Sequence, residues 1–486
     1  MKKSALLILF FLLAGWLPAE EEGLTCFTVL VGTGASADGS LLLAHNEDDS
    51  GRLLVNIHKV PALEHRPGDV FLLKGGTTLP RTTNAPGLLW LEIPESDFAD
   101  SYVNEFGVAL TSDSCHSRED RAELTEGGIG FSLRRLVAER ARTAREGVRA
   151  AGELIARYGY NAPGRTYIIA DSKEGWLLHA VKGKHWVAQR VPEKEIAVIA
   201  NRYTITAVDL ADTDNFLGSP DIIEYAVRRG WYDPQRDGEF NFARAYSHPD
   251  KYADQGNLLR QWRGLDLLAD KPRKPGDPLP FSFKPRRPVR LNDLFRVLRD
   301  HYEGTKFDGS NHYRNGSPNS GKYRTICTES TQYAFVAHMR SWLPAEIANV
   351  IWIALRRPDS NAFSPWYVSL ANVPTGASRE TPEAAWKNHF APLPAQALED
   401  PGLAFNTYSR LSETVDRQYR GRIEKVQKVW RNFEDFLFSD LKDHEKEFVF
   451  LLKNNRDLAR HIIDNYIHGL EYRKWFLASE LLKEFR

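Results

Sequence analysis

The sequence predicts an α+β fold of antiparallel strands with a helical C-terminal region, and three features carry this prediction. Short β-branched and aromatic runs, separated by turn residues, are dense in the first two hundred positions. Helical patterns lie between those runs. Beyond residue 405, apolar residues recur every three or four positions, which is typical of amphipathic helices packed on a core.

The composition indicates a folded chain and excludes some partners. The 486 residues include 42% hydrophobic residues and 12 tryptophans, and this length allows one large domain or several ordinary ones. Sixty-four basic residues balance 64 acidic residues, so no overall electrostatic field attracts nucleic acid or an acidic membrane. We therefore expect partners to be recognised locally, and the sequence leaves a homo-oligomer open.

The first 19 residues have the order of a secretory signal peptide. Two lysines precede an apolar run of about a dozen residues, and a proline and an alanine follow it. The run is short for a membrane span; a retained N-terminal anchor is the alternative. Cleavage after Ala19 would leave a prepiece, residues 20–25 (EEEGLT), ahead of Cys26. We expect export to a periplasm or outside the cell, with no membrane contact in the mature form.

The first strands are expected as a hairpin. In residues 26–31 (CFTVLV), the odd and the even positions both carry apolar side chains, which is typical of a strand buried on both faces. The Asp38-Gly39 pair is a strong turn signal, and residues 41–47 (LLLAHNE) return as the second strand. Further strand runs, expected as antiparallel hairpins, lie at 165–171, 175–191 and 195–201.

Helices and loops follow from similar local signals. Thr143 and Glu146 form a capping box, and Gly159 ends the helical pattern that they open. Core packing explains the C-terminal apolar stripe better than a cofactor site does; the stripe consists of Leu411, Val415, Tyr419, Ile423, Val426, Trp430, Phe433 and Leu437. Residues 271–290 are expected as a solvated loop rather than an anion site, and the loop 308–324 has the length of loops that line active sites.

The chain has three cysteines, Cys26, Cys115 and Cys327. An odd number in an exported chain leaves a free thiol or an intermolecular bridge. The sequence has no CxxC pair and no His/Cys cluster at zinc spacing, so we expect neither a metal nor a cofactor. Cys26 is either a buried structural cysteine or, if cleavage precedes it, a residue that carries both a thiol and an α-amine. That amine, with a pKa of about 7.7 to 8.0, could act as base for the thiol.

Several blocks of the sequence, in order, resemble the cysteine-type dipeptidases of the N-terminal nucleophile hydrolase superfamily, which are relatives of the secernins. The blocks are CFTVLVGTGASADGSLLLAHNEDDS from Cys26, NEFGVALTSDS at 104–114, VIANRYTI at 198–205 and YRTICTESTQYAFVAHMRSWLPAEIANVIWIAL at 323–355. The resemblance implies a four-layer αββα sandwich of antiparallel sheets. The corresponding domain would span residues 26–400, with residues 401–486 as a helical region packed on it.

The resemblance also implies a chemistry. The prepiece would be removed autocatalytically, and Cys26 would then hydrolyse dipeptides through a thioester. Asp48 would orient the new N-terminus. The side-chain amide of Asn201 would help to form the oxyanion hole, although an asparagine that ends a strand at a turn is the alternative. Backbone N–H groups near Asp113 and Ser114 are candidates for a second donor.

The sequence does not decide the roles of two candidate site residues or the formation of one disulfide. His45 stands where the family usually has arginine, so we treat it as a residue that tunes the thiol in a pH-dependent way, a surface histidine being the alternative. Arg324 either supports the site or binds a substrate carboxylate. A disulfide between Cys115 and Cys327 would leave Cys26 as the single free thiol.

Two other functions fit the sequence. One is an amidase of the same superfamily that acts on N-acyl amino acids or on bile-salt-like or penicillin-like linear amides. The other is a secreted binding protein that has lost catalysis, which the histidine at position 45 would favour. The leading prediction is an exported dipeptidase that takes small peptides as substrates.

Overall fold

The computed structural model describes residues 25–49, 52–73 and 76–486. The predicted signal peptide, 1–19, lies outside the described residues, and so does the prepiece apart from Thr25. Within the described ranges, no helix combines the length and the apolar character that a membrane crossing requires.

One antiparallel sheet has six strands in the order β14-β1-β2-β16-β17-β18. Its strands are β1 (Phe27–Val31), β2 (Leu41–Asp48), β14 (Ile196–Ile199), β16 (Thr331–Met339), β17 (Asn349–Leu355) and β18 (Ser364–Tyr367). The predicted hairpin of β1 and β2 is confirmed, with Thr28 opposite His45. Gly39 adopts a φ of +84° in the connecting turn, a conformation that glycine reaches without strain.

The second antiparallel sheet has eight strands in the order β15-β13-β12-β11-β10-β9-β8-β3. Its strands are β3 (Asn56–Val60), β8 (Leu88–Glu92), β9 (Ser101–Asn104), β10 (Ala109–Ser114), β11 (Tyr160–Ala170), β12 (Gly175–Gly183), β13 (Trp186–Arg190) and β15 (Phe216–Gly218). Two small two-stranded sheets pair β4 (Leu63–Glu64) with β7 (Asn84–Ala85) and β5 (Val70–Leu72) with β6 (Thr78–Pro80).

Two expectations about strands need correction. The run 175–191 is two strands, because the chain turns after Gly183, where φ is +91°. The run 195–201 does not form a hairpin with the run before it. It supplies β14, which pairs with β1 in the other sheet. Long-range pairing of this kind leaves no local sequence signal.

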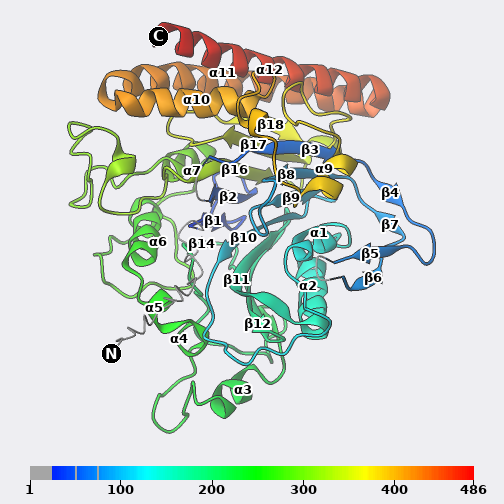
Figure 1. Ribbon diagram of the computed structural model, residues 1–486, viewed down its shortest axis with the longest axis vertical. Coiled ribbons are helices and arrows are strands. Elements are labelled where there is room, and N and C mark those ends of the chain that lie inside the picture. Colours follow the sequence, from blue (N-terminus) through cyan, green and yellow to red (C-terminus); the bar gives the residue numbers. More distant parts are fainter. Residues whose placement is uncertain (1–24, 50–51, 74–75) are drawn as a thin grey trace, which may run out of the picture.

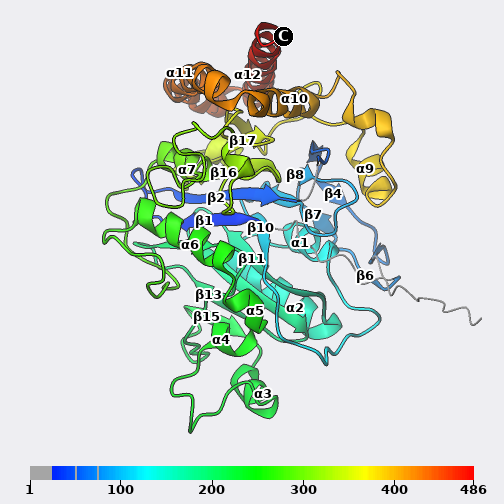
Figure 2. The same ribbon diagram turned by 60° about the vertical axis from the view of Figure 1, so that its left-hand side comes forward.

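The two sheets face one another, and helices cover their outer sides (Figures 1 and 2). Helices α1 (Ser132–Ala138) and α2 (Ala144–Tyr158) pack on the eight-stranded sheet, and α6 (Gln255–Leu268) and α7 (Leu291–Leu298) pack on the six-stranded sheet. The hydroxyl of Thr28 on β1 donates to Asp113 on β10 across the inner interface, at 2.7 Å. The candidate site lies at this interface.

The predicted helices are confirmed. Thr143 Oγ1 accepts from the backbone N–H of Glu146 at 3.2 Å, and α2 ends at Gly159. The C-terminal region forms α10 (Ala404–Arg417), α11 (Tyr419–Asn454) and α12 (Arg456–Glu484), and every residue of the predicted apolar stripe is buried. The proposed domain boundaries stay a prediction. The shorter helices are α3 (Ile222–Arg228), α4 (Phe242–Tyr246), α5 (Pro249–Tyr252), α8 (Ala345–Ala348), α9 (Pro382–Asn388) and the 3₁₀ turns Pro318–Ser320 and Ala395–Leu398.

The disulfide between Cys115 and Cys327 that the sequence left open is not formed, because all three cysteines are free and buried. Cys115 lies at the end of β10, where its sulfur is 3.0 Å from Thr166 Oγ1. Cys327 lies in the loop before β16, close to His301 and Asp359. Each side chain therefore has its own polar surroundings.

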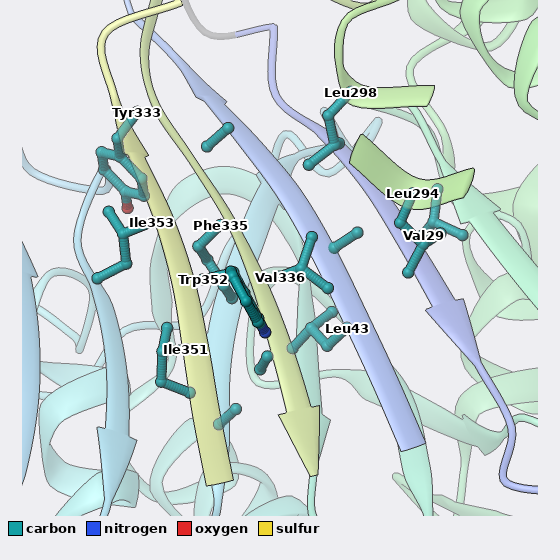
Figure 3. Packing of buried hydrophobic residues seen from close by; sticks show 14 of the residues in the cluster. Val29, Leu43, Leu294, Leu298, Tyr333, Phe335, Val336, Ile351, Trp352 and Ile353 are labelled. Atoms are coloured by element: carbon teal, nitrogen blue, oxygen red, sulfur yellow. The ribbon is translucent and has the colours of Figure 1, made fainter. Parts of the chain in front are cut away.

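The helix layer is held to the six-stranded sheet by large apolar side chains (Figure 3). Leu294 and Leu298 of α7 lie over β1 and β2, near Val29 and Leu43. Trp352 of β17 is almost fully buried and contacts Phe295 of α7 and Phe438 of α11, with ring centroids 5.8 Å and 5.1 Å away. This tryptophan thus joins the sheet to both helix groups.

We expect Trp352→Ala to lower the free energy of unfolding by about 3 to 5 kcal/mol, because it leaves a large cavity in a packed core. Phe450→Ala is the matched control, since Phe450 lies on α11 with 64% of its surface exposed; its change should stay within about 0.5 kcal/mol. Urea denaturation of both variants measures the difference. Equal losses would contradict the proposed role of Trp352.

Candidate active site

Cys26 lies immediately before β1, and the register of the hairpin determines its neighbours. Because Phe27 opposes Asn46 and Thr28 opposes His45, the next pair along the hairpin is Cys26 and Glu47. The thiol donates a hydrogen bond to Glu47 Oε1 at 3.1 Å and lies 3.8 Å from the backbone oxygen of Asp48. The direct partner of the thiol is therefore Glu47 rather than the carboxylate of Asp48.

A chain of hydrogen bonds continues from Glu47 to the other sheet. Glu47 Oε2 is 3.0 Å from His45 Nε2, and His45 Nδ1 is 2.8 Å from Thr28 Oγ1. Thr28 gives its only hydroxyl proton to Asp113, so it accepts from His45 Nδ1–H. A neutral imidazole protonated on Nδ1 then accepts at Nε2, which requires the proton to be on Glu47 Oε2.

Burial favours these neutral forms. Desolvation is the main cause that raises the pKa of Cys26 and of Glu47 well above their usual values; for Cys26, the nearby Glu47 charge adds to it. Desolvation also holds the pKa of His45 well below its usual value, followed by the charges of Arg134 and Arg165. Burial therefore favours the neutral form of each of the three groups, the thiol, the carboxyl and the imidazole.

Asp48 contacts the residue that precedes the candidate nucleophile. Its carboxyl accepts from Thr25 Oγ1 at 3.1 Å and from Thr331 Oγ1 at 2.6 Å. Burial raises its pKa to about 6, although these two hydrogen bonds oppose the shift. Asp48 thus lies beside the N-terminal side of Cys26, as its predicted role requires.

Arg260 on α6 is a site residue that the sequence did not reveal. Its Nη1 donates to the backbone carbonyl oxygens of Thr25 and Cys26, the latter at 3.0 Å, and the side chain is fully buried. Its Nη2 donates to Asn201 Oδ1 at 2.8 Å. The guanidinium therefore contacts the carbonyl of the bond between Thr25 and Cys26.

Asn201 lies next to Arg260 in a left-handed conformation, with φ +55°. Its Nδ2 donates to the carbonyl oxygen of Ser114 at 3.1 Å. In the uncleaved chain the amide of Asn201 is thus engaged with the backbone of β10, and Ser114 contributes a carbonyl to this contact. The other predicted arginine, Arg324, is exposed, and its charge affects the pKa of both Asp48 and Arg260.

Four of the five predicted site residues, Cys26, His45, Asp48 and Asn201, are thus connected by hydrogen bonds through partners that sequence reasoning missed, whereas Arg324 is exposed and acts on the site through its charge. Glu47 had a usable signal, because residues two apart on a strand share a face and the hairpin turn sets the register. Arg260 had none, since it reaches the site from a helix far along the chain. The arrangement offers a nucleophile, a path for its proton and a cation on the adjacent carbonyl, which are the requirements of acyl transfer.

Comparison with known proteins agrees with this chemistry. The site and the matches define a cysteine-type peptidase. Residues 25–392 match Peptidase family C69, and the chain belongs to this family. It is 29% identical to "Probable dipeptidase" of Salmonella dublin over 73% of this chain and 83% of that protein. It is 25% identical to "Dipeptidase A" of Lactobacillus helveticus over 93% of this chain and 99% of that protein.

Among solved structures, the chain is similar to penicillin V acylase from Agrobacterium tumefaciens. The identity is 12%, the TM-score is 0.32, and the match covers 68% of this chain and 82% of that one. An N-acylethanolamine-hydrolyzing acid amidase orthologue of Caenorhabditis elegans matches with 12% identity and a TM-score of 0.28, over 64% and 92% of the two chains. TM-scores this low identify neither fold nor activity.

The buried carboxyl of Asp113 predicts a pH-dependent contribution to stability in the uncleaved chain. Burial raises its pKa to about 7, whereas an unfolded aspartate titrates near 3.9. Between about pH 4 and 7 the folded state holds a proton that the unfolded chain has released, so this contribution falls as the pH rises through that window.

The measurement compares Cys26→Ala with Cys26→Ala/Asp113→Asn by urea denaturation from pH 5 to 8. Between pH 5 and 8, the free energy of unfolding of Cys26→Ala should fall by on the order of 3 kcal/mol more than that of the double variant. The two variants are compared because buried histidines raise the stability of both as the pH rises, and this effect cancels in the difference. Burial lowers the pKa of His179, for example, to about 3. A difference that is flat, or that rises with pH, would show that Asp113 is ionised in the folded state.

Proposed function

We propose that this protein is an exported dipeptidase whose nucleophile, Cys26, becomes the N-terminal residue when the prepiece is removed. The observation that carries the proposal is the contact of Arg260 with the Thr25 carbonyl while the Cys26 thiol is bonded to Glu47. The signal-like first 19 residues support export, and the relatives named dipeptidases support the substrate class. Two facing sheets with outer helices support the αββα arrangement of N-terminal nucleophile hydrolases.

Removal of the prepiece is an intramolecular acyl shift. The thiol proton moves to Glu47 Oε1 while the proton on Oε2 moves to His45 Nε2, and Cys26 Sγ attacks the carbonyl carbon of Thr25. Arg260 stabilises the negative charge that develops on the carbonyl oxygen. The C–N bond breaks as the new amine takes the proton from Glu47 Oε1 and His45 returns its proton to Oε2, and water hydrolyses the resulting thioester. Glu47 and His45 act here because an amide nitrogen cannot serve as a base.

After cleavage the α-amine of Cys26 lies beside its own thiol and takes over as base. Asp48, freed from Thr25, accepts hydrogen bonds from the N–H groups of the new amine and fixes its position. The amine takes the thiol proton as the sulfur attacks the dipeptide carbonyl, and it passes that proton to the leaving amino group. Water then hydrolyses the thioester, which releases the acyl product and restores the thiol. Asn201 and Arg260 are the donors for the oxyanion, and the exposed Arg324 attracts the substrate carboxylate.

We expect Cys26→Ala to abolish both steps, because no other group at the site can attack the Thr25 carbonyl. N-terminal sequencing and intact mass should show that the wild-type chain begins at Cys26 and that the variant keeps the residues before it. Dipeptide hydrolysis by the variant should fall to the uncatalysed rate. Hydrolysis that survives the substitution would contradict a cysteine nucleophile.

Glu47→Gln keeps the size and a hydrogen bond but cannot pass a proton, so we expect the prepiece to be removed at least tenfold more slowly. Glu92→Gln is the matched control. Glu92 makes a similar buried contact with His58, at 2.7 Å, on a different pair of strands, and this variant should be processed at the wild-type rate. Intact mass against time after synthesis measures both. Normal processing of Glu47→Gln would exclude the carboxyl from the step.

The amidase alternative differs in what the substrate carries at its amino end. A dipeptidase with the proposed site should hydrolyse a free dipeptide at least tenfold faster, in kcat/KM, than its N-acetylated form. An amidase for N-acyl amino acids should show the reverse order. Mature wild-type enzyme and a pair such as Ala-Leu and N-acetyl-Ala-Leu are sufficient for the comparison.

A further inference from the structure

A second buried cluster of a cysteine, a histidine and a carboxylate lies away from Cys26. His301 follows α7, Cys327 precedes β16, and Asp359 follows β17. Their side chains are at most 2% exposed. The sulfur, one imidazole nitrogen and one carboxylate oxygen all lie within 4.8 Å of one another. Three separate segments of the chain thus bring these ligand-type atoms to one point.

The geometry differs from that of the Cys26 cluster. There, His45 and Glu47 are hydrogen-bonded at 3.0 Å. Here, His301 Nε2 is 3.7 Å from Asp359 Oδ2, which is too long for a hydrogen bond, and its other polar neighbour is the Cys327 thiol, within 4.8 Å. A zinc ion with bonds of 2.0 to 2.3 Å separates tetrahedral ligand atoms by about 3.3 to 3.8 Å. The spacing therefore suits a shared metal better than a direct contact.

Neighbouring side chains make hydrogen bonds to His301 and Asp359 and fix their orientation, as is common for residues that bind a metal. The other ring nitrogen of His301, Nδ1, is 3.2 Å from Glu303 Oε1, and a carboxylate on the distal nitrogen is common for zinc-bound histidines. Asp359 accepts from Ser360 Oγ and from the hydroxyl of Tyr419 on α11, both at 2.9 Å. These contacts fix the imidazole and the carboxylate while Nε2 still faces the other two ligand atoms.

The cations around the cluster are paired with carboxylates. Arg357 lies 3.6 Å from Asp359 Oδ1 and pairs with Asp416 at 2.7 Å. Arg263 and Arg299, which line the neighbouring cavity, pair with Asp300 and Glu434. Asp359 and Glu303 are the carboxylates nearest to His301. A cavity of about 480 Å³ reaches Asp359, Glu303 and Tyr313, and residues of or near α6, α7 and α11, four arginines among them, line the rest of it. It gives access to the Asp359 side of the cluster.

We propose that His301, Cys327 and Asp359 bind one zinc ion that fastens three segments of the chain together. Sulfur and imidazole ligands select zinc over calcium or magnesium, and Cys327 releases its thiol proton to solvent on binding. The segment that carries Cys327 continues to Thr331, whose hydroxyl donates a hydrogen bond to Asp48 of the candidate active site. The ion would thus stabilise the segment that holds the Asp48 carboxyl. The proposal is independent of the peptidase activity.

The test uses the Cys26→Ala chain, because that variant removes the thiol of the other cluster. After exposure to zinc and dialysis, mass spectrometry of the metal should find one zinc ion per chain. Cobalt(II) in its place should give the intense visible bands of a tetrahedral site and a near-ultraviolet thiolate band. An added Cys327→Ser should remove the thiolate band and most of the zinc, whereas an added Cys115→Ser, the matched buried cysteine, should keep both.

A stability measurement covers the case in which the Cys327 variant does not fold. The Cys26→Ala chain should melt several degrees higher with zinc than after chelation, since a ligand that binds only the folded state raises Tm. Cobalt titration of this chain without a thiolate band, or zinc below about 0.1 ion per chain, would overturn the proposal. His301 would then be an imidazolium held between Glu303 and Asp359 with no metal.

Discussion

The pairing of Cys26 with Glu47 across the β1 and β2 hairpin is the constraint on which the site depends. Side chains alternate along a strand, so Val29 faces α7 while Thr28 faces the other sheet. A slip of one residue would exchange these faces and move the thiol away from Glu47. The hairpin turn and the apolar packing under α7 therefore set the chemistry as well as the fold.

The second constraint is the low polarity of the space between the sheets. Thiol, carboxyl and imidazole are stable there as neutral groups, because each charged form would lose its hydration. An arginine at position 45 would bring a permanent charge into this chain of hydrogen bonds. His45 brings a group that can gain or lose a proton, while Arg134 and Arg165 supply positive charge nearby.

Local signals in the sequence were enough for much of the fold. The β1 and β2 hairpin, α2 with its cap, and the buried stripe of the C-terminal helices each depend on neighbouring residues, and the structure agrees with all of them. The placement of β14 beside β1, and of Arg260 on the Thr25 carbonyl, depends on pairing between distant segments. The same reason hides His301, Cys327 and Asp359 from a search for metal-binding spacing, since each comes from a different segment.

The complete burial of Cys26 has a consequence for the life of the uncut chain. Oxidants and electrophiles react with thiolates, and a neutral thiol without exposed surface is a poor target for them. The uncut chain thus shields its most vulnerable atom. Under the proposed cleavage after Thr25, a new amino group would form next to the Asp48 carboxyl, so the protein would acquire its reactivity and a new internal contact in a single irreversible event.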